Sequence, residues 1–167
     1  IGSVLVVFIP KSRPTLAKQL ALAISLITLA LTIVMALQFD GASNEPFQFV
    51  ESYPWIPAFG ISYSVGVDGI GLVLIALATT LVPIVVIAGW RDVDATSGGS
   101  VKGYFALILA METLMIGVFA ATDVFMFFVL FEAILIPVYF MIGRYGGPQR
   151  SYAAVKFLLY SLLGGLF

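Results

Sequence analysis

Residues 124–143 read VFMFFVLFEAILIPVYFMIG, an apolar run whose single charged residue is Glu132. A helix needs about 20 mostly apolar residues to cross the hydrocarbon core of a bilayer. The run has that length and no turn signal except Pro137. Buried helices of a large soluble protein are the alternative interpretation, so the composition of the whole chain has to decide between the two.

That composition favours lipid as the solvent. The chain has 167 residues, of which 61% are hydrophobic and 10% are charged. An ordinary soluble domain is about 45–50% apolar and about 25% charged, and a compact domain of this size still exposes much of its surface to water. We therefore expect an all-α, polytopic integral membrane protein, or a piece of one.

Five further apolar runs flank the first, and together they predict about six spans. The first and last runs are short, so we expect truncated spans and a chain that is a fragment. The predicted spans are Ile1–Pro10, Leu20–Phe39, Gly69–Trp90, Gly103–Ala121, Val124–Gly143 and Ser151–Phe167.

The basic residues alternate between loops. Every Lys and Arg except Lys156 falls in or beside the loops after the first, third and fifth spans. The positive-inside rule places such loops in the cytoplasm, so the start of the chain is expected outside a bacterial inner membrane. The net charge of −1 gives no reason to expect a nucleic-acid partner. The residues in these loops are Lys11, Arg13, Lys18, Arg91, Lys102, Arg144 and Arg150.

The loop over residues 38–67 carries no Lys or Arg, so we place it on the non-cytoplasmic side. Residues 47–50 and 61–65 alternate between apolar and polar side chains, and prolines and aromatics lie between them. This pattern predicts a surface β-hairpin.

Two aspartates precede predicted helices. The glycines over residues 66–71 suggest a nucleotide-binding loop, but their spacing is not GxGxxG and the helix that follows is a membrane span. Asp68 as an N-cap, with glycines that ease the start of the helix, is the better interpretation. Asp123 is expected to cap the next-but-one span in the same way.

Three ionisable residues interrupt the spans: Glu112, Glu132 and Lys156. A charge at the bilayer centre costs about 2.5–3.5 kcal/mol on insertion scales. The two glutamates lie at similar counts on either side of the turn at 122–123, so both are expected near mid-bilayer. Pro137 removes a helical hydrogen bond one turn past Glu132. A buried carboxylate beside a kinked, hydrated helix is a candidate proton-translocation site.

Each of these residues also has a purely structural interpretation. Lys156 lies near the cytoplasmic end of its helix, where it can extend to the headgroups. Against that, Tyr152, Lys156 and Tyr160 form a polar stripe with Gly164, which is expected to face other helices. Glu132 and Glu112 are candidates for proton transfer, with ion pairing between helices as the alternative.

The chain has no cysteine and no histidine, so the usual ligands of iron–sulfur clusters, haem and structural zinc are missing. We expect no cofactor in this chain.

Four stretches resemble one known family. They are WIPAFGISYSVGVDGI at 55–70, IGVFAATD at 116–123, FEAILIPVYFMI at 131–142 and AAVKFLLY at 153–160. These resemble the M-type subunits of bacterial NADH–quinone oxidoreductase (respiratory complex I) and their mitochondrial subunit 4 counterparts, which belong to the antiporter-like Mrp family. The similarity covers most of the chain from Trp55 onward.

The resemblance implies the N-terminal portion, residues 1–167, of a single antiporter-like domain of fourteen helices. In that family, the glutamate at the position of Glu132 pairs with a lysine on the seventh helix and gates proton movement. Lys156 matches a lysine of bacterial members, whereas Glu112 lies outside the family motif. NADH, flavin, iron–sulfur clusters and quinone would be held by other subunits.

The expected function is proton translocation by a membrane-arm subunit, driven by quinone reduction elsewhere in the complex. The expected partners are the other membrane-arm subunits, a respiratory supercomplex and lipids. The alternative is a D-type subunit of a multisubunit Na+/H+ antiporter, which shares the fold and the buried glutamate. A purely structural membrane scaffold is a third interpretation, against which the mid-bilayer Glu132 argues.

Overall fold

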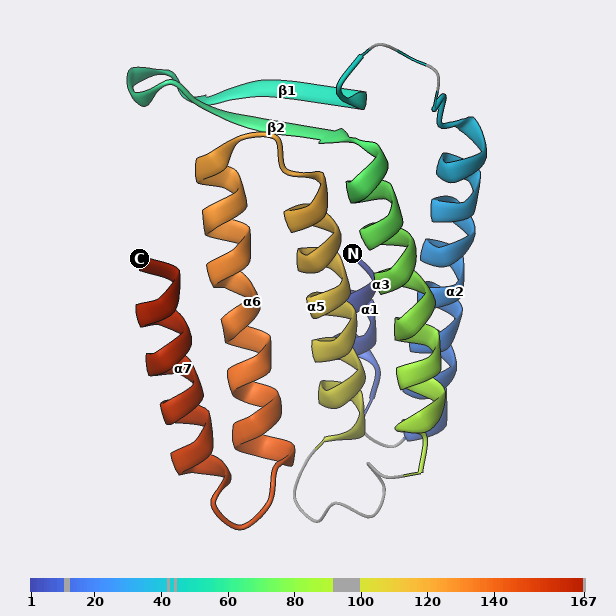
Figure 1. Cartoon of the computed structure of the whole chain (residues 1–167). Coiled ribbons are helices and arrows are strands. Elements are labelled where there is room, and N and C mark those ends of the chain that lie inside the picture. Colours follow the sequence, from blue (N-terminus) through green and yellow to red (C-terminus); the bar gives the residue numbers. More distant parts are fainter. Residues whose placement is uncertain (11–12, 42, 44, 92–99, 167) are drawn as a thin grey trace.

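A computed structural model of the chain describes residues 1–10, 13–41, 43, 45–91 and 100–166. Helices dominate it, and a single β-hairpin lies between the second and third (Figure 1). The elements are α1 (Gly2–Phe8), α2 (Pro14–Gln38), β1 (Gln48–Ile56), a 3-10 turn η1 (Pro57–Phe59), β2 (Ile61–Val67), α3 (Gly69–Ala88), α5 (Val101–Ala120), α6 (Val124–Tyr145) and α7 (Arg150–Leu166).

Successive helices run up and down beside one another (Figure 1). Among the described residues, α2, α3, α5 and α6 are long and apolar enough to cross a membrane. This arrangement confirms the expected polytopic helical membrane protein. The C-terminal ends of α1, α3 and α6 all lie at one end of the bundle, and the hairpin lies across the other end (Figure 1). The helix ends that border the loops expected to be basic therefore share one end.

The hairpin occupies the loop where alternation predicts strands. β1 and β2 pair antiparallel, with Ser52 opposite Ser64. Gly60, after η1, has a φ of +67°, a left-handed conformation that favours glycine. The hairpin lies over the ends of α5 and α6 and extends past α6 (Figure 1).

Hydrogen bonds fasten β2 to the short turn between α5 and α6. The Thr122 backbone N–H donates to the Ser64 carbonyl at 3.0 Å. The Thr122 hydroxyl donates to the Ser64 hydroxyl at 2.7 Å, and Val65 forms an isolated bridge with Ala121. The hairpin and the helix pair are thus held as one unit at this end.

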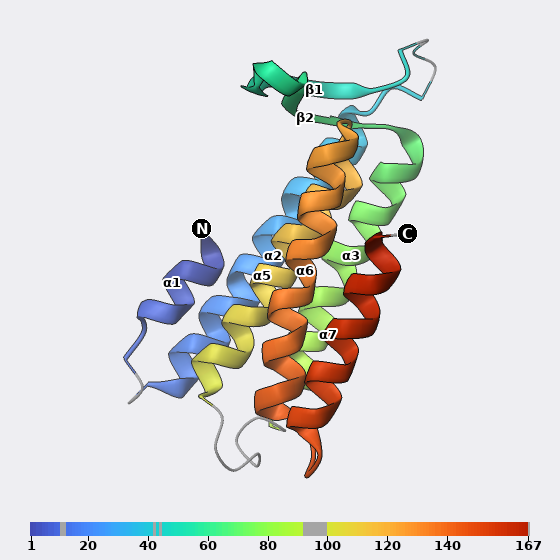
Figure 2. The same cartoon turned by 90° about the vertical axis from the view of Figure 1, so that its left-hand side faces the viewer.

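The best-packed core lies where α1, α2, α3 and α5 meet (Figure 2). Phe105, Leu109 and Val86 are almost completely buried there. The Ser3 hydroxyl donates to the Ala106 carbonyl at 2.8 Å and joins α1 to α5. The rest of the surface is rich in exposed leucine, isoleucine and phenylalanine, which suits contact with lipid or further helices.

Two lysines assigned above to loops lie inside helices. Because proline is favourable at the first helical position, α2 begins at Pro14 instead of Leu20, and Lys18 falls within it. Lys18 is only 5% exposed and donates to the Trp90 carbonyl at 2.6 Å, beyond the end of α3. Lys102 lies in the first turn of α5. Lys11 lies outside the described residues.

Lys102 plays the same role at another helix end. Its ammonium group donates to the carbonyls of Val7 at 2.8 Å and Ile9 at 2.9 Å, at the end of α1. A cation at a helix C-terminus is stabilised by the helix dipole and satisfies carbonyls that lack helical donors. The physical reason for the differing helix bounds is therefore that each lysine finds acceptors on a neighbouring helix.

Candidate functional site: two buried glutamates on either side of α6

The two aspartates act as helix N-caps. Asp68 accepts from the Gly71 N–H at 2.6 Å at the start of α3. A Cβ at Gly71 would lie 2.9 Å from the Asp68 carboxylate and 2.9 Å from the Phe119 carbonyl, so this position requires glycine. Asp68 and Gly71 therefore act together at the start of α3. The aspartate caps the helix, and the glycine lets it approach α5 closely.

Asp123 has two roles. It accepts from the Met126 N–H at 3.0 Å as the N-cap of α6, and from the Ser62 N–H at 3.4 Å in β2. Chiefly the Met126 N–H holds the pKa of the Asp123 carboxyl below its ordinary value of 3.8, and the Ser62 N–H adds to the effect. Asp123 is thus the anionic link between the hairpin and the helix that carries Glu132.

Glu132 lies in the seam between α6 and α7. Both of its carboxylate oxygens are buried and have no hydrogen-bond partner among the described residues. A Cβ added at Gly165 of α7 would overlap one of these oxygens. The missing side chain at Gly165 therefore creates the space that the carboxylate occupies.

The same seam continues three helical turns away. Gly143 of α6 faces Ala154 of α7, whose Cβ would lie 3.5 Å from a Cβ at Gly143. Glu132 and Gly143 share one face of α6, and Ala154 and Gly165 share one face of α7, because each pair is about three turns apart. Small residues let the two helices approach closely and enclose the carboxylate.

Glu112 lies in a different place. It is 3% exposed, and its Oε1 has no hydrogen-bond partner in the part of the chain that the structure describes. It lines a cavity of about 210 Å³ between α3, α5 and α6. The other lining residues are apolar or thioether side chains: Ala78, Leu81, Val82, Val85, Ile108, Met111, Met115 and Met141.

The two glutamates are at similar depth but do not face each other. A Cβ at Gly117 would lie 3.1 Å from Leu130, which sets the register of α5 against α6. In this register Glu112 and Glu132 are within about one helical turn in depth. Met141 faces the cavity of Glu112 and is about two and a half turns from Glu132. Glu132 therefore projects from the opposite face of α6.

Each glutamate site has a proline inside one of the helices that form it. Pro137 of α6 and Pro83 of α3 both lie within their helices and are buried. A proline lacks the N–H that would bond the carbonyl four residues earlier. This leaves the carbonyl of Ala133, next to Glu132, without its helical donor. The carbonyl of Thr79, next to Ala78 of the cavity wall, loses its donor in the same way.

Lys156 is not brought to either glutamate. It is exposed on α7, with its Nζ 5.7 Å from the centre of the Tyr152 ring and 5.9 Å from that of Tyr160. Lys156 precedes Gly165 by about two and a half turns and so lies on the opposite face of α7. Tyr152 and Tyr160 are exposed among the described residues, as Lys156 is, and Gly165 lies against Glu132 on the other face of α7.

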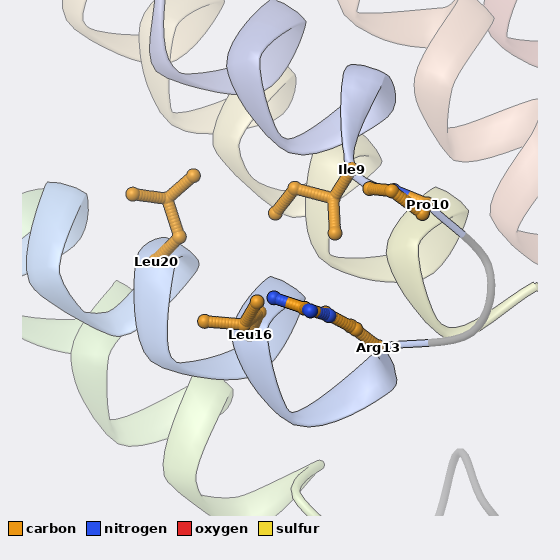
Figure 3. Close-up of a pocket in the computed structure, with 5 residues that line it drawn as sticks. All are labelled: Ile9, Pro10, Arg13, Leu16 and Leu20. Carbon is orange, nitrogen blue, oxygen red and sulfur yellow. The ribbon is translucent and has the colours of Figure 1, made fainter.

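A second groove lies at the basic end, between the end of α1 and the start of α2 (Figure 3). Its volume is about 500 Å³, and Arg13 is the ionisable residue among the described residues that line it. Ile9 and Pro10 line it from the segment just after α1, and Leu16 and Leu20 line it from α2. It contains neither glutamate, so we do not assign it to the same site. No group of three or more metal-ligating side chains occurs among the described residues.

Comparisons with known proteins find a family match for the segment that contains Glu132 and relatives that match nearly the whole chain. The family described as "NADH:quinone oxidoreductase/Mrp antiporter, TM" matches residues 121–167, which include α6 and α7. NADH-quinone oxidoreductase subunit M of Mycobacterium tuberculosis is 46% identical over 191 residues, which cover 99% of this chain and 34% of that protein. The chain is a homologue of NADH-quinone oxidoreductase subunit M. NADH-ubiquinone oxidoreductase chain 4 of Arabidopsis thaliana is 42% identical and covers all of this chain.

A solved structure shows the fold independently. A chain of the Mrp complex from Dietzia sp. DQ12-45-1b superposes with a TM-score of 0.76 over 99% of this chain and 17% of that one, at 21% identity. This likeness shows the antiporter-like fold. The chain spans about a third of the length of its subunit M relatives.

Sequence reasoning found the residues of the site but not their surroundings. Glu112, Glu132 and Pro137 are visible as interruptions of apolar runs. The role of Gly165 was missed, although its spacing from Ala154 repeats that between Glu132 and Gly143. Such small-residue spacing on neighbouring helices is the signal that could have found it.

Proposed function

We propose that the protein containing this chain is a proton-translocating membrane-arm subunit of an NADH-quinone oxidoreductase. Support comes from subunit M relatives at 46% identity and a chain 4 relative at 42%. NADH, flavin, iron–sulfur clusters and quinone belong to other subunits in this proposal. Its partners are the other membrane-arm subunits, together with lipids and a respiratory supercomplex. Quinone reduction elsewhere in the complex drives the protons.

The observation that carries the proposal is the state of Glu132. A carboxylate with two buried, unpartnered oxygens is costly unless it is protonated or meets a cation or water. It therefore has two alternative states: a neutral acid that holds a proton, and an anion that needs a positive partner. A group with these two states in mid-bilayer can pass a proton on.

The surroundings of Glu132 support this use. Gly165 leaves space at the carboxylate, and Pro137 leaves the carbonyl of Ala133 available to water. The resemblance implies that the cationic partner is a lysine on the seventh helix of the family's fold. Within the described residues, Lys156 does not serve as that partner, because it faces away from the seam.

A D-type antiporter subunit is the second candidate, and the Mrp complex likeness favours it at the level of fold. Sequence identity is 21% in that case and 46% for subunit M. The higher identity supports the respiratory complex as the first proposal. Replacement of Na+ by K+ in the assay distinguishes the two, because proton movement by an antiporter would require the exchanged ion.

The test replaces Glu132 by Gln in the full-length subunit within the complex. Gln keeps the shape and hydrogen-bonding capacity but removes the titrating proton. We expect normal assembly and a loss of about a hundredfold in proton uptake by inverted vesicles, as for removal of a proton-transfer group. Glu51→Gln, on the exposed hairpin, is the control and should pump normally.

Glu132→Asp should retain part of the pumping because it shortens the side chain by one methylene but keeps the carboxylate. Subunit content is checked by blotting. An assembled Glu132→Gln complex that pumps at the unmodified rate would show that this glutamate is structural.

We also propose that the end with the basic loops faces the cytoplasm of a bacterial cell and that the hairpin faces outward. Single cysteines at Ser52, in β1, and at Gln149, between α6 and α7, are both exposed. An impermeant thiol reagent should label them from opposite sides of the membrane. Labelling of both from the same side would refute the topology.

A further inference from the structure

Glu112 is a buried acid that the proposed role of Glu132 does not use. Its side chain is 3% exposed, and no described residue forms a hydrogen bond with Oε1. It borders a cavity of about 210 Å³ between α3, α5 and α6. An unpartnered buried carboxyl oxygen costs about 1–3 kcal/mol or more. This cost is removed only if something enters the cavity or binds to the oxygen.

The cavity wall offers the carboxyl no counter-ion. α3 has no ionisable side chain along its whole length, and α6 contributes Met141 to the wall. Glu132 and the terminal Arg144 of α6 are not among the lining residues. On the other neighbours of α5, α1 has no ionisable side chain. Lys18 of α2 is bonded to the Trp90 carbonyl.

The other ionisable groups on α5 and β2 lie away from the cavity. Lys102 is bonded to two carbonyls of α1. Tyr104 stacks edge-to-face on Tyr145 at 5.2 Å, at the basic end, and Tyr63 of β2 lines a hairpin pocket with Tyr53. None of them lines the cavity. In these surroundings the neutral, protonated acid is favoured in a dry cavity, and the anion is favoured only when water enters.

The cavity has room for that water. A water molecule needs roughly 10–15 Å³ of such space and two to four polar partners. Glu112 Oε1 supplies one partner. Pro83, buried in α3, leaves the Thr79 carbonyl behind this wall without its helical donor, but Thr79 itself does not line the cavity. Waters that bond Glu112 and one another fit between walls that are otherwise apolar.

We propose that Glu112 and its cavity form a second proton-binding site, in which water carries the proton to and from the carboxyl group. The step balances simply: the carboxylate takes H+ from a hydronium ion and leaves water, and the reverse releases it. The wall provides one carboxylate and no second charged ligand, which suits a proton and not a metal ion. Because Glu112 faces away from Glu132, this site does not depend on the role proposed for Glu132.

Infrared difference spectroscopy of the full-length chain in its membrane complex tests the proposal. Spectra recorded between two pH values should contain a protonated-carboxyl C=O band that titrates. Glu112→Gln should abolish this band, and Glu132→Gln should leave it in place. Glu112→Asp should shift the band without abolishing it, which separates titration from a failure to fold. A spectrum unchanged by Glu112→Gln would overturn the proposal.

Filling the cavity gives a second measurement. Ala78→Met adds volume at the cavity wall and should exclude water, so that the band no longer responds to exchange into heavy water. Ala76→Met, on the same helix but outside the lining, is the matched control and should keep the exchange. Exchange that persists unchanged in an assembled Ala78→Met protein would show that the cavity is not the proton route.

Discussion

Glu132 and Glu112 are two carboxyl groups of similar depth with opposite surroundings. Glu132 is enclosed by close helix packing, where Gly165 provides room for the carboxylate and little else. Glu112 borders an open volume of about 210 Å³ with apolar walls. The first site is controlled by contact with a neighbouring helix and the second by access of water. Depth in the membrane alone therefore does not define what a buried acid can do.

The largest effect that would sharpen this comparison is expected at Gly165. Gly165→Ala places a Cβ where the Glu132 carboxylate lies, so either the helix or the carboxylate must move. Overpacking of this kind costs about 1–3 kcal/mol. We expect proton pumping in vesicles to fall about tenfold, which corresponds to about 1.4 kcal/mol.

The neighbouring glycine provides the matched control. Nothing lies within 4 Å of a Cβ at Gly164, so Gly164→Ala should pump normally. Equal losses in the two variants would mean that helix flexibility, and not space at the carboxylate, explains the glycines. The infrared band of Glu112 should be unchanged in both.

A double-mutant cycle provides the next test. Glu112→Gln and Glu132→Gln share no contact and project from different faces of the α5–α6 pair. Changes at sites without shared partners usually add to within about 0.5 kcal/mol. The double variant should therefore show the sum of the two single losses in the logarithm of the pumping rate. A large coupling energy would show that one path joins the two acids.

A smaller effect is expected on stability. Glu112→Leu replaces an unpartnered buried carboxyl by an apolar side chain of similar size, which suits the wall of the cavity. We expect the assembled subunit to become more resistant to thermal unfolding by about 1 kcal/mol, the order of the cost of an unsatisfied buried group. A clear destabilisation would show that Glu112 has a structural partner, contrary to the comparison.

The smallest effect concerns the link between the hairpin and α6. The pKa of Asp123 is lowered in the folded protein. Its contribution to stability is therefore complete above the ordinary value of 3.8 and is lost as the pH falls through the lowered value. Asp123→Asn keeps an acceptor for the Met126 N–H and should remove this acid dependence. Hydrogen exchange at Ser62 between neutral and acid pH measures it, with Asp68→Asn as the control for a cap without a hairpin contact.

Much of the fold is readable from the sequence. The apolar runs locate each helix that the structure describes, because each crossing must satisfy its own backbone groups. The paired strands follow from alternation over residues 47–50 and 61–65. Helix ends were less accurate at Pro14 and Val101, because Lys18 and Lys102 find acceptors on neighbouring helices and so tolerate positions inside a helix. Such acceptors are separated from the lysines by many residues and leave no local signal.

The site was predicted only in part, for a related reason. Composition identifies Glu112 and Glu132, since a charge in an apolar run is conspicuous. It does not determine the rotation of α5 and α6, and that rotation sends Glu112 to α3 and Glu132 to α7. The rotation of α7 likewise depends on packing, which turns Ala154 toward α6.

The bond from Lys18 to the Trp90 carbonyl also has a consequence for how the bundle lies in a bilayer. α2 has 25 residues and so a length of about 37 Å, whereas α3 has 20 residues and a length of about 30 Å, close to the thickness of the hydrocarbon core. A helix that is too long for the core must tilt or let one end emerge. The ammonium group, anchored to the end of the shorter helix, fixes the level at which α2 leaves the hydrocarbon. The first turn of α2 is thereby kept in the headgroup layer, and the mismatch is absorbed without tilting α2 away from α3.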